Sequence, residues 1–365
     1  MKLLNIVTII SAASLSWSCV NNNGNENVDD FDIKEILNNA ADNLILPQFE
    51  DLKESTIALE SAHNDFKSSD TPENLLAFQN KFKESYASWQ ACSFVNYGNS
   101  NLASLSGTLN MYPTDVEKIN SILNSSDPFD LNSGTYANAK GFPGLDYLLF
   151  DGLESEILNR VSIEGSEYCS SNIELMKTKS QSAYDFWKND TDGFYSKFIS
   201  STTKSEGTPF SLFINGFVKN VEVLKNGQLG VPAGKFTLND PRPEQSEALY
   251  SGYSVTLFKA HLENLKRVYK GEDLLGNDGV GMDDYLKALG TKRGGEDLNE
   301  LILNTFNTIE EKANLLNGSM NDAIANQQEI TDELYLKIKE LVAYLKVDMT
   351  DAFGVLITYQ DNDGD

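Results

Sequence analysis

Apolar side chains recur every three or four residues along much of this chain, and that spacing constrains the fold more than any other feature. The pattern is clear within residues 72–97 and 244–270 and again near 334–345. Such spacing gathers apolar side chains on one face of an α-helix. Strand-like alternation is confined to the short segment 354–359. The sequence therefore predicts an all-α protein of helices packed around apolar faces.

Local signals mark several helix boundaries. Thr71 followed by Pro72 predicts an N-cap with proline at the first helical position. The run from Thr114 to Glu117 follows Pro113 and is typical of a capping box. Gly271 closes the apolar pattern that begins near residue 244 and predicts the end of that helix.

The chain divides into two predicted halves. A polar break over 201–209 places the boundary near residue 205, which gives a first helical-bundle half over 33–204 and a second over 205–365. A stretch rich in Gly and Pro, 226–243, is expected to wrap the surface without regular structure.

A short motif occurs in both halves. Gly141 is followed after four residues by Asp146-Tyr-Leu, and Gly279 is followed in the same way by Asp284-Tyr-Leu. A match of this length arises by chance or from duplication of a helical unit. If it reflects duplication, the two halves contain related loop-to-helix corners.

The N-terminus has the features of a bacterial lipoprotein signal. Residues 1–18 carry an early lysine, an apolar run from Ile6 to Leu15 and small residues before Cys19. This run is too short to cross a bilayer. We expect cleavage before Cys19, a lipid on its thiol and a polar tether over 19–32; the alternative is an ordinary cleaved signal with an incidental cysteine. The lipid would hold the protein at a bacterial membrane, with the outer membrane as the expected location.

Charge excludes one class of partner. Asp and Glu total 54 against 29 Lys and Arg, for a formal net charge of −25. Phosphate backbones would be repelled, so nucleic acid is not an expected partner. The acidic surface favours cations but does not by itself make a metal site.

Two cysteines remain beyond the expected lipidation site. Cys92 and Cys169 both fall in helix-like sequence. In an oxidising compartment they could form a disulfide. Cysteine in a helix also serves as a small buried apolar residue, and the sequence leaves both interpretations open.

Familiar catalytic motifs are missing. The chain has two histidines, His63 and His261, and no His-Glu-x-x-His helix. Glu60 and His63 have the spacing of a di-iron ligand pair, but the second pair such a site needs is absent, because Phe258 precedes His261. The Glu60–His63 pair is therefore interpreted as an exposed pair on a solvated helix face, and His261 as structural. There is no Gly-x-Ser-x-Gly elbow or phosphate-binding glycine loop, and the acidic tail 361–365 is only the beginning of a calcium loop.

The most informative segment lies between Lys140 and Asp151. Gly141 and Pro143 predict a sharp corner, and we expect Asp146 in the first turn of the helix that follows. In one interpretation this is a capping turn stapled by Phe142 and Leu148. In the other it faces a pocket where the two halves meet.

Several segments together resemble one known family. They are 141–150, 250–254, 269–271, 345–348 and 354–365. These segments are similar to the imelysin-like family, and the resemblance extends from about residue 35 to the C-terminus. It implies two related helical-bundle halves with a site near their junction, in bacterial periplasmic or outer-membrane proteins, often lipoproteins, that are tied to iron uptake. Some members have been classed as metallopeptidases.

The chain departs from the family at its marked motif, Gly-x-His-x-x-Glu. Gly141 matches the glycine, but Pro143 replaces the histidine and Asp146 replaces the glutamate. Proline has no ligand atom, and one carboxylate without histidine is a poor zinc site and a weak iron site. Peptidase activity is therefore not expected, and Asp146 stays a weak candidate ligand for iron or another divalent cation.

These observations favour a non-enzymatic, membrane-tethered binding protein for iron or haem acquisition, with a ligand or partner held between the halves. The alternatives are an imelysin-type metallopeptidase, or a lipoprotein that only docks iron-uptake proteins of the envelope. The candidate ligand-binding residues are Gly141, Pro143 and Asp146 on one wall, Ser251 and Ser254 on the other, and Asp284 at the pseudo-symmetric position.

Overall fold

The computed structural model describes residues 31–359, and the chain from Asp32 onward forms one compact unit. Helices dominate this unit, which confirms the predicted all-α class, and its described strands form a single hairpin, β1 (Lys292–Arg293) and β2 (Glu296–Asp297). The predicted signal peptide, Cys19, nearly all of the tether and the acidic tail lie outside the described residues. None of the helices in residues 31–359 is both long and apolar enough to cross a membrane.

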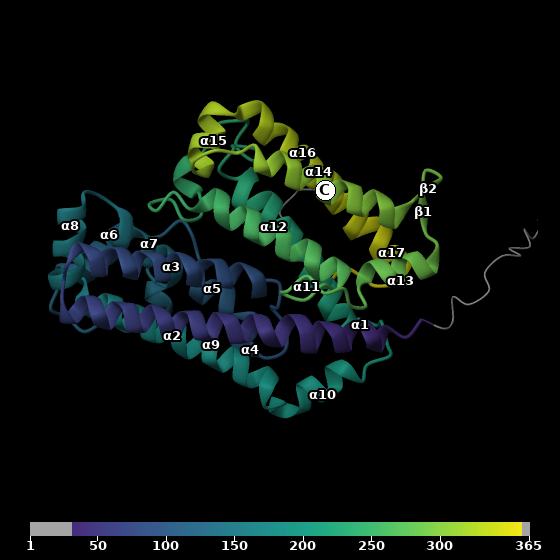
Figure 1. The fold of residues 1–365 in the computed structure, drawn as a ribbon, viewed down its shortest axis with the longest axis horizontal. Helices are drawn as coiled ribbons and strands as arrows, with labels where there is room; N and C mark the ends of the chain where they lie inside the picture. Colours follow the sequence, from purple (N-terminus) through teal and green to yellow (C-terminus); the bar gives the residue numbers. More distant parts are fainter. Residues whose placement is uncertain (1–30, 360–365) are drawn as a thin grey trace, which may run out of the picture. The chain divides into compact units, whose positions relative to one another are not determined.

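Three long helices form the first group of packed elements (Figure 1). They are α2 (Leu46–Ser68), α3 (Pro72–Cys92) and α9 (Ser166–Lys188). The predicted apolar positions of α3 all face inward, and Phe78, Phe82 and Tyr86 are fully buried. Shorter elements complete this part of the chain: α1 (Ile33–Asn39), η2 (Ala40–Ile45), α4 (Ser100–Ala103), α5 (Leu105–Leu109), α6 (Val116–Leu123), η3 (Gly134–Tyr136), α7 (Gly141–Phe150), α8 (Glu154–Asn159), η4 (Arg160–Glu164), η5 (Thr191–Gly193) and α10 (Phe194–Ile199).

A second group of helices lies above the first in Figure 1. Its main members are α11 (Pro209–Glu222), α12 (Ser254–Lys270), α14 (Leu298–Asn314) and α16 (Gln328–Ala343). Helix α12 packs on α3 of the first group as well as on α11 and α14, so it links the two groups. The remaining elements are η6 (Val223–Gly230), η7 (Pro243–Gln245), α13 (Met282–Leu289), α15 (Met320–Asn326), η8 (Tyr344–Met349) and α17 (Thr350–Phe353).

Capping chemistry explains several of the helix boundaries. The backbone N–H of Asn74 donates to Thr71 Oγ1 at 3.3 Å, which confirms the predicted N-cap of α3. Helix α6 is capped by Asp115, one residue after the predicted Thr114, because the Asp115 carboxylate accepts the N–H of Lys118. Helix α12 ends at Lys270 and is capped by Gly271, as predicted; the glycine has φ of 70°, a left-handed conformation that glycine adopts without strain.

Three predictions of secondary structure were wrong in detail. Residues 226–230 of the stretch that was expected to be irregular belong to η6, and Gln228, Leu229 and Gly230 are buried. The helix expected from residue 244 begins only at Ser254, and a turn precedes it in which Ala248 has φ of 48° and Gly252 φ of 64°. The expected strand over 354–359 is an extended segment without a partner strand. Asn215 supplies its hydrogen bonds instead: Nδ2 donates to the Leu356 carbonyl at 2.9 Å, and Oδ1 accepts the Thr358 N–H at 2.8 Å.

Both cysteines are free thiols buried in helices, so the disulfide alternative is not realised. Burial raises the pKa of Cys92, and it raises the pKa of Cys169 to about 12. These groups pack as small apolar side chains, the other interpretation left open by the sequence.

The predicted boundary between two halves near residue 205 stays a prediction. Likewise, the described residues do not directly show the predicted duplication. The halves are nevertheless useful names for residues 33–204 and 205–365, because the candidate site brings side chains from both together.

Candidate functional site

The predicted corner at Gly141 is fixed by a side chain from α9. Gly141 has φ of 70°, and a Cβ there would overlap the carbonyl oxygen of Leu109. Its N–H donates to Asn172 Oδ1 at 2.7 Å, and Asn172 Nδ2 donates back to the Gly141 carbonyl at 3.0 Å. Only glycine fits this position, so α7 begins at a defined point on the helical core.

Aromatic packing then holds α7 against α3. The Phe142 ring stacks on Tyr86 with centroids 4.5 Å apart and the planes 8° from parallel. Phe142 and Leu148 are both fully buried. This packing fixes the part of α7 that carries the polar side chain between these two residues, while the stapled capping turn stays a prediction.

That side chain is Asp146, and it reaches across to the second half of the chain. Asp146 is only 1% exposed. Its Oδ2 accepts the backbone N–H of Tyr250 at 2.8 Å, and its Oδ1 accepts that of Ser251 at 3.2 Å. We expected Asp146 in the first helical turn. It lies in the second turn, because α7 starts at Gly141.

Burial and hydrogen bonding act in opposite directions on this carboxyl group. Burial raises the pKa of Asp146 to about 6, with a smaller contribution from the charge of Glu247, whereas hydrogen bonds from Ser251 and Tyr250 lower it. The larger effect is loss of hydration. The group is therefore ionised at neutral pH and becomes protonated under mildly acidic conditions.

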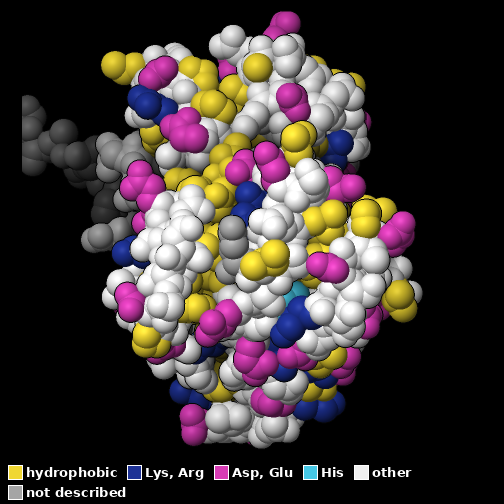
Figure 2. Space-filling view, turned by 90° about the vertical axis from the view of Figure 1, so that its left-hand side faces the viewer, with side chains coloured by type: hydrophobic (Ala, Val, Ile, Leu, Met, Phe, Trp, Pro, Cys, Tyr) yellow, Lys and Arg dark blue, Asp and Glu magenta, His cyan; other side chains and the backbone are white. Residues whose placement is uncertain are grey.

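A pocket of about 200 Å³ opens beside Asp146. Residues from both halves line it: Tyr112, Pro113, Thr114, Pro143, Asp146, Glu244, Ser246, Ala248, Leu249 and Tyr250. Figure 2 looks onto the end of the molecule where α6 and α8 lie in Figure 1. Hydrophobic side chains gather there in an indentation between the upper and lower parts.

The structure brings some of the predicted residues together. Pro143 and Asp146 line the pocket, and Ser251 contacts Asp146 through its N–H. Gly141 acts one turn away by fixing the start of α7. Ser254 is not among the residues that line the pocket. Its Oγ accepts the N–H of Met320 at the start of α15.

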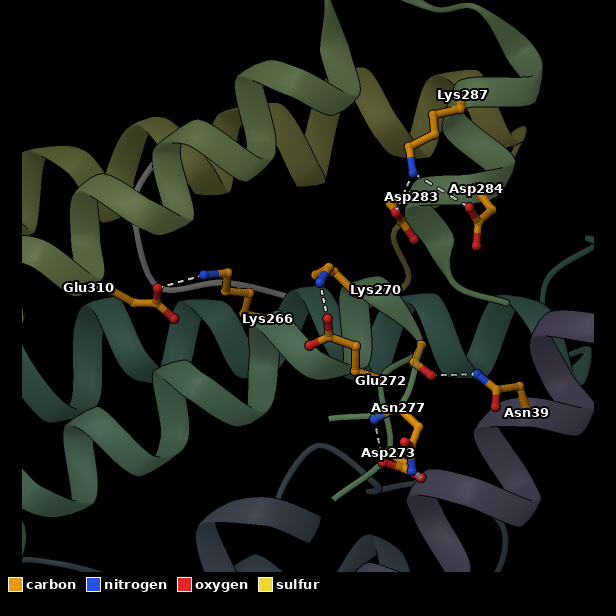
Figure 3. Close-up of polar contacts among 11 residues, drawn as sticks. Asn39, Lys266, Lys270, Glu272, Asp273, Asn277, Asp283, Asp284, Lys287 and Glu310 are labelled. Atoms are coloured by element: carbon orange, nitrogen blue, oxygen red, sulfur yellow. Dashed lines mark hydrogen bonds and ion pairs between the residues drawn. The ribbon is translucent and has the colours of Figure 1, made fainter. Parts of the chain in front are cut away.

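Asp284 is not among the residues that line this pocket. Its Oδ2 accepts the Gly281 N–H at 3.0 Å and caps α13, and its Oδ1 lies 3.5 Å from Lys287 Nζ. Figure 3 shows this second corner, where Lys287 lies between Asp283 and Asp284 and Asn39 of α1 reaches in from the side. Asn39 Nδ2 donates to the Gly271 and Val280 carbonyls, much as Asn172 holds Gly141.

Sequence reasoning missed the buried carboxyl group of Glu247. It is 2% exposed and follows Ser246, so its side chain lies behind the pocket wall. Oε1 accepts Gln90 Nε2 at 2.7 Å and Asn110 Nδ2 at 2.6 Å, and Oε2 accepts Gln228 Nε2 at 2.5 Å. Gln90 and Asn110 belong to the first half and Glu247 to the second. Glu247 therefore accepts hydrogen bonds from the first half, whereas Asp146 of the first half accepts them from the second.

A second layer of side chains orients these donors. The Tyr86 hydroxyl donates to Asn110 Oδ1 at 2.6 Å. His261 Nδ1 lies 3.0 Å from Gln228 Oε1, and Nε2 lies against Asn220 Oδ1, so each ring nitrogen faces an amide oxygen. Burial lowers the pKa of His261 to about 3, which keeps the ring neutral. His261 is structural, as predicted, and helps to hold Gln228 toward Glu247.

His63 is also buried, which corrects the expectation of an exposed Glu60–His63 pair. Its ring lies 5.2 Å from that of Phe78, and burial lowers its pKa to about 4. Glu60 pairs instead with Lys177 at 2.7 Å. In residues 31–359 no three His, Cys, Asp or Glu side chains are grouped so that they could hold a metal ion.

The residues at the corner do not fit a family-type metal site. Pro143 offers no donor atom where the family has histidine, and both oxygens of Asp146 already accept backbone N–H groups. The chemistry available here is hydrogen bonding, aromatic contact and negative charge.

Comparison with known proteins decides the family. The family model for imelysin, peptidase M75, matches residues 45–345. The chain belongs to the imelysin family. None of the curated proteins matches it.

Two solved structures share the imelysin fold over almost the whole chain. One is described as a putative iron-regulated protein A precursor from Parabacteroides distasonis; it is 16% identical with a TM-score of 0.69, over 90% of this chain and 96% of that one. The other is described as an imelysin-like protein from Psychrobacter arcticum; it is 15% identical with a TM-score of 0.69, over 89% and 96% of the two chains.

Proposed function

We propose that this imelysin-family protein is a non-enzymatic binding protein, held at a bacterial membrane by a lipid on Cys19, that serves iron or haem acquisition. The pocket beside Asp146 carries the proposal. It is lined by both halves, and the carboxylate in its wall contacts the backbone of the opposite half. A ligand bound there would contact both halves at once.

The iron connection rests on the family and on the description of one structural neighbour as iron-regulated. The expected outer-membrane location rests on residues 1–19, with a lipid as the link to the membrane. Iron-uptake proteins of the envelope are the proposed partners.

Peptidase activity is the second candidate, favoured by the family's name. Cleavage of a peptide requires a water activated by a metal or by a general base. Asp146 is ionised at neutral pH, but its two oxygens are held by N–H groups and no histidine stands beside it. The third candidate is docking without a ligand, which predicts a shallow, featureless junction and no ligand in the pocket of about 200 Å³.

The first test compares binding and cleavage on one preparation. The chain from residue 20 on keeps the whole compact unit, and it would be studied as wild type and as Asp146→Ala. We would measure metal content, calorimetry with iron, zinc and calcium salts, and cleavage of an unfolded protein substrate. Cleavage that disappears in Asp146→Ala would overturn the non-enzymatic proposal.

A second test addresses the role in the cell. Deletion of the gene should slow growth when iron is chelated, and the wild-type gene should restore it. Cys19→Ala should move the protein from the membrane fraction to the soluble fraction. Equal growth with and without the gene under iron limitation would contradict the proposed role.

A further inference from the structure

The pocket beside Asp146 is surrounded by negative charge. Asp146 and the exposed Glu244 line it, and no lysine or arginine is among the lining residues. Glu247 lies directly behind the wall, between Ser246 and Ala248, which both face the pocket. The charge of Glu247 contributes to the raised pKa of Asp146.

The contacts of Glu247 favour its charged form without cancelling the charge. Its three amide donors come from Gln90, Asn110 and Gln228, which are uncharged. A further donor points the same way behind Asn110, because the Tyr86 hydroxyl donates to Asn110 Oδ1. Such chains of donors polarise one another toward the group on which they converge. Burial raises the pKa of Glu247, and these hydrogen bonds oppose that effect.

The rest of the pocket wall is aromatic and apolar. Tyr112 and Tyr250 line it together with Pro113, Pro143 and Leu249. The Tyr250 ring packs edge-on against Tyr147 with centroids 5.2 Å apart, which limits its movement. Aromatic faces attract cations, most strongly where water is excluded.

A bare metal ion and an organic cation need different surroundings. A metal ion needs several donor atoms in direct contact, and here the Asp146 oxygens are committed to N–H groups. An ammonium group on an apolar body needs a negative potential, aromatic faces and apolar walls, and this pocket supplies all three.

We infer that the pocket beside Asp146 selects a small organic cation, in which a substituted ammonium group is carried on an apolar body. This inference rests on the proposed function of the pocket as a ligand site. The pocket volume of about 200 Å³ limits the bound part to a small group or to one end of a larger molecule.

A matched set of small probes tests the charge requirement. Choline is the cation, 3,3-dimethylbutan-1-ol has the same shape without the charge, and 3-methylbutanoate is an anion of similar size. Binding to the chain from residue 20 on would be followed by ligand-observed NMR at low ionic strength. We expect choline to bind about tenfold more tightly than the alcohol and the anion not to bind.

Two variants tie binding to the pocket. Glu244→Gln changes an exposed pocket residue and should weaken choline binding about twofold to threefold, whereas Glu311→Gln, an exposed glutamate on α14, should not. Tyr250→Leu removes a ring but keeps the N–H that Asp146 accepts. It should reduce choline binding and leave the alcohol nearly unchanged.

Each result decides the inference. Equal binding of choline and the alcohol at the pocket would show a ligand site without charge selection; the proposed function would stand and the inference would fall. Absence of choline binding, or choline binding unaffected by both pocket variants, would also overturn the inference. The calorimetry and cell-growth tests would then judge the proposed function independently.

Discussion

The Asp146 carboxyl group allows a quantitative test of burial against hydrogen bonding. Burial raises its pKa to about 6 from an ordinary value of 3.8. The difference of about two pH units, at about 1.4 kcal/mol per unit, corresponds to about 3 kcal/mol. The folded state binds the proton more tightly than the unfolded state does. This contribution to stability is therefore complete below about pH 4 and is lost as the pH rises through about 6.

The comparison variant is Asp146→Asn, which is uncharged throughout. One of the two backbone N–H groups, of Tyr250 or Ser251, then faces an amide nitrogen and lacks an acceptor, at a cost of about 1–3 kcal/mol at any pH. The free energy of unfolding would be measured in urea for both proteins at several pH values. The cost of the unpaired N–H group is the same at every pH, whereas the contribution of the Asp146 proton changes with pH. Effects from titrating groups that do not interact with Asp146 cancel in the difference.

Wild type should lose stability relative to Asp146→Asn by about 2 kcal/mol between about pH 4.5 and about pH 7.5. A difference that stays constant over this range would refute the claim that burial dominates. A difference that grows in favour of wild type as the pH rises would show that the two N–H donors outweigh the loss of hydration.

Three further predictions follow from packing. Gly141→Ala should lower the free energy of unfolding in urea by at least about 2 kcal/mol, because the new Cβ would overlap the Leu109 carbonyl. The control Gly193→Ala has φ of 68° but open space around it, so it should cost only about 1 kcal/mol. Equal costs for the two variants would contradict the steric argument. Glu247→Ala should destabilise the protein by more than about 3 kcal/mol, because it leaves three buried amide donors without their acceptor. The control Glu244→Ala should change stability by less than about 0.5 kcal/mol. Similar values for the two variants would mean that the buried network is not formed. The thiols of Cys92 and Cys169 should resist a thiol reagent in the folded protein and react at once in denaturant, and rapid labelling of the native protein would contradict their burial.

The sequence predicts the helices well where one apolar face decides them. The spacing of Phe78, Phe82 and Tyr86 alone identifies the buried face of α3. Segment 354–359 was misread because its alternation is real: Val355 is 5% exposed and Leu356 is 70% exposed. The alternation arises from an extended segment held by Asn215, a side chain far away in sequence, and no local pattern reveals such a partner.

The candidate site was predictable only in part, for the same reason. Gly141, Pro143 and Asp146 stand out because they are close together in an unusual motif. Glu247 does not stand out, because Gln90, Asn110 and Gln228 come from three distant segments, and polar residues of this kind are usually exposed. Their burial becomes visible only when the helices that carry them are packed together.

The contact from Asp146 to residues 250 and 251 has a consequence for how the pocket can change over generations. Asp146 accepts hydrogen bonds from main-chain N–H groups, which every amino acid except proline supplies. The side chain at position 250 can therefore be exchanged while the wall on which it stands keeps its anchor. Side-chain atoms at position 250 determine what the pocket binds, whereas main-chain atoms hold the two halves together. Single substitutions at position 250 could therefore change the ligand during evolution while the contact with Asp146 is kept.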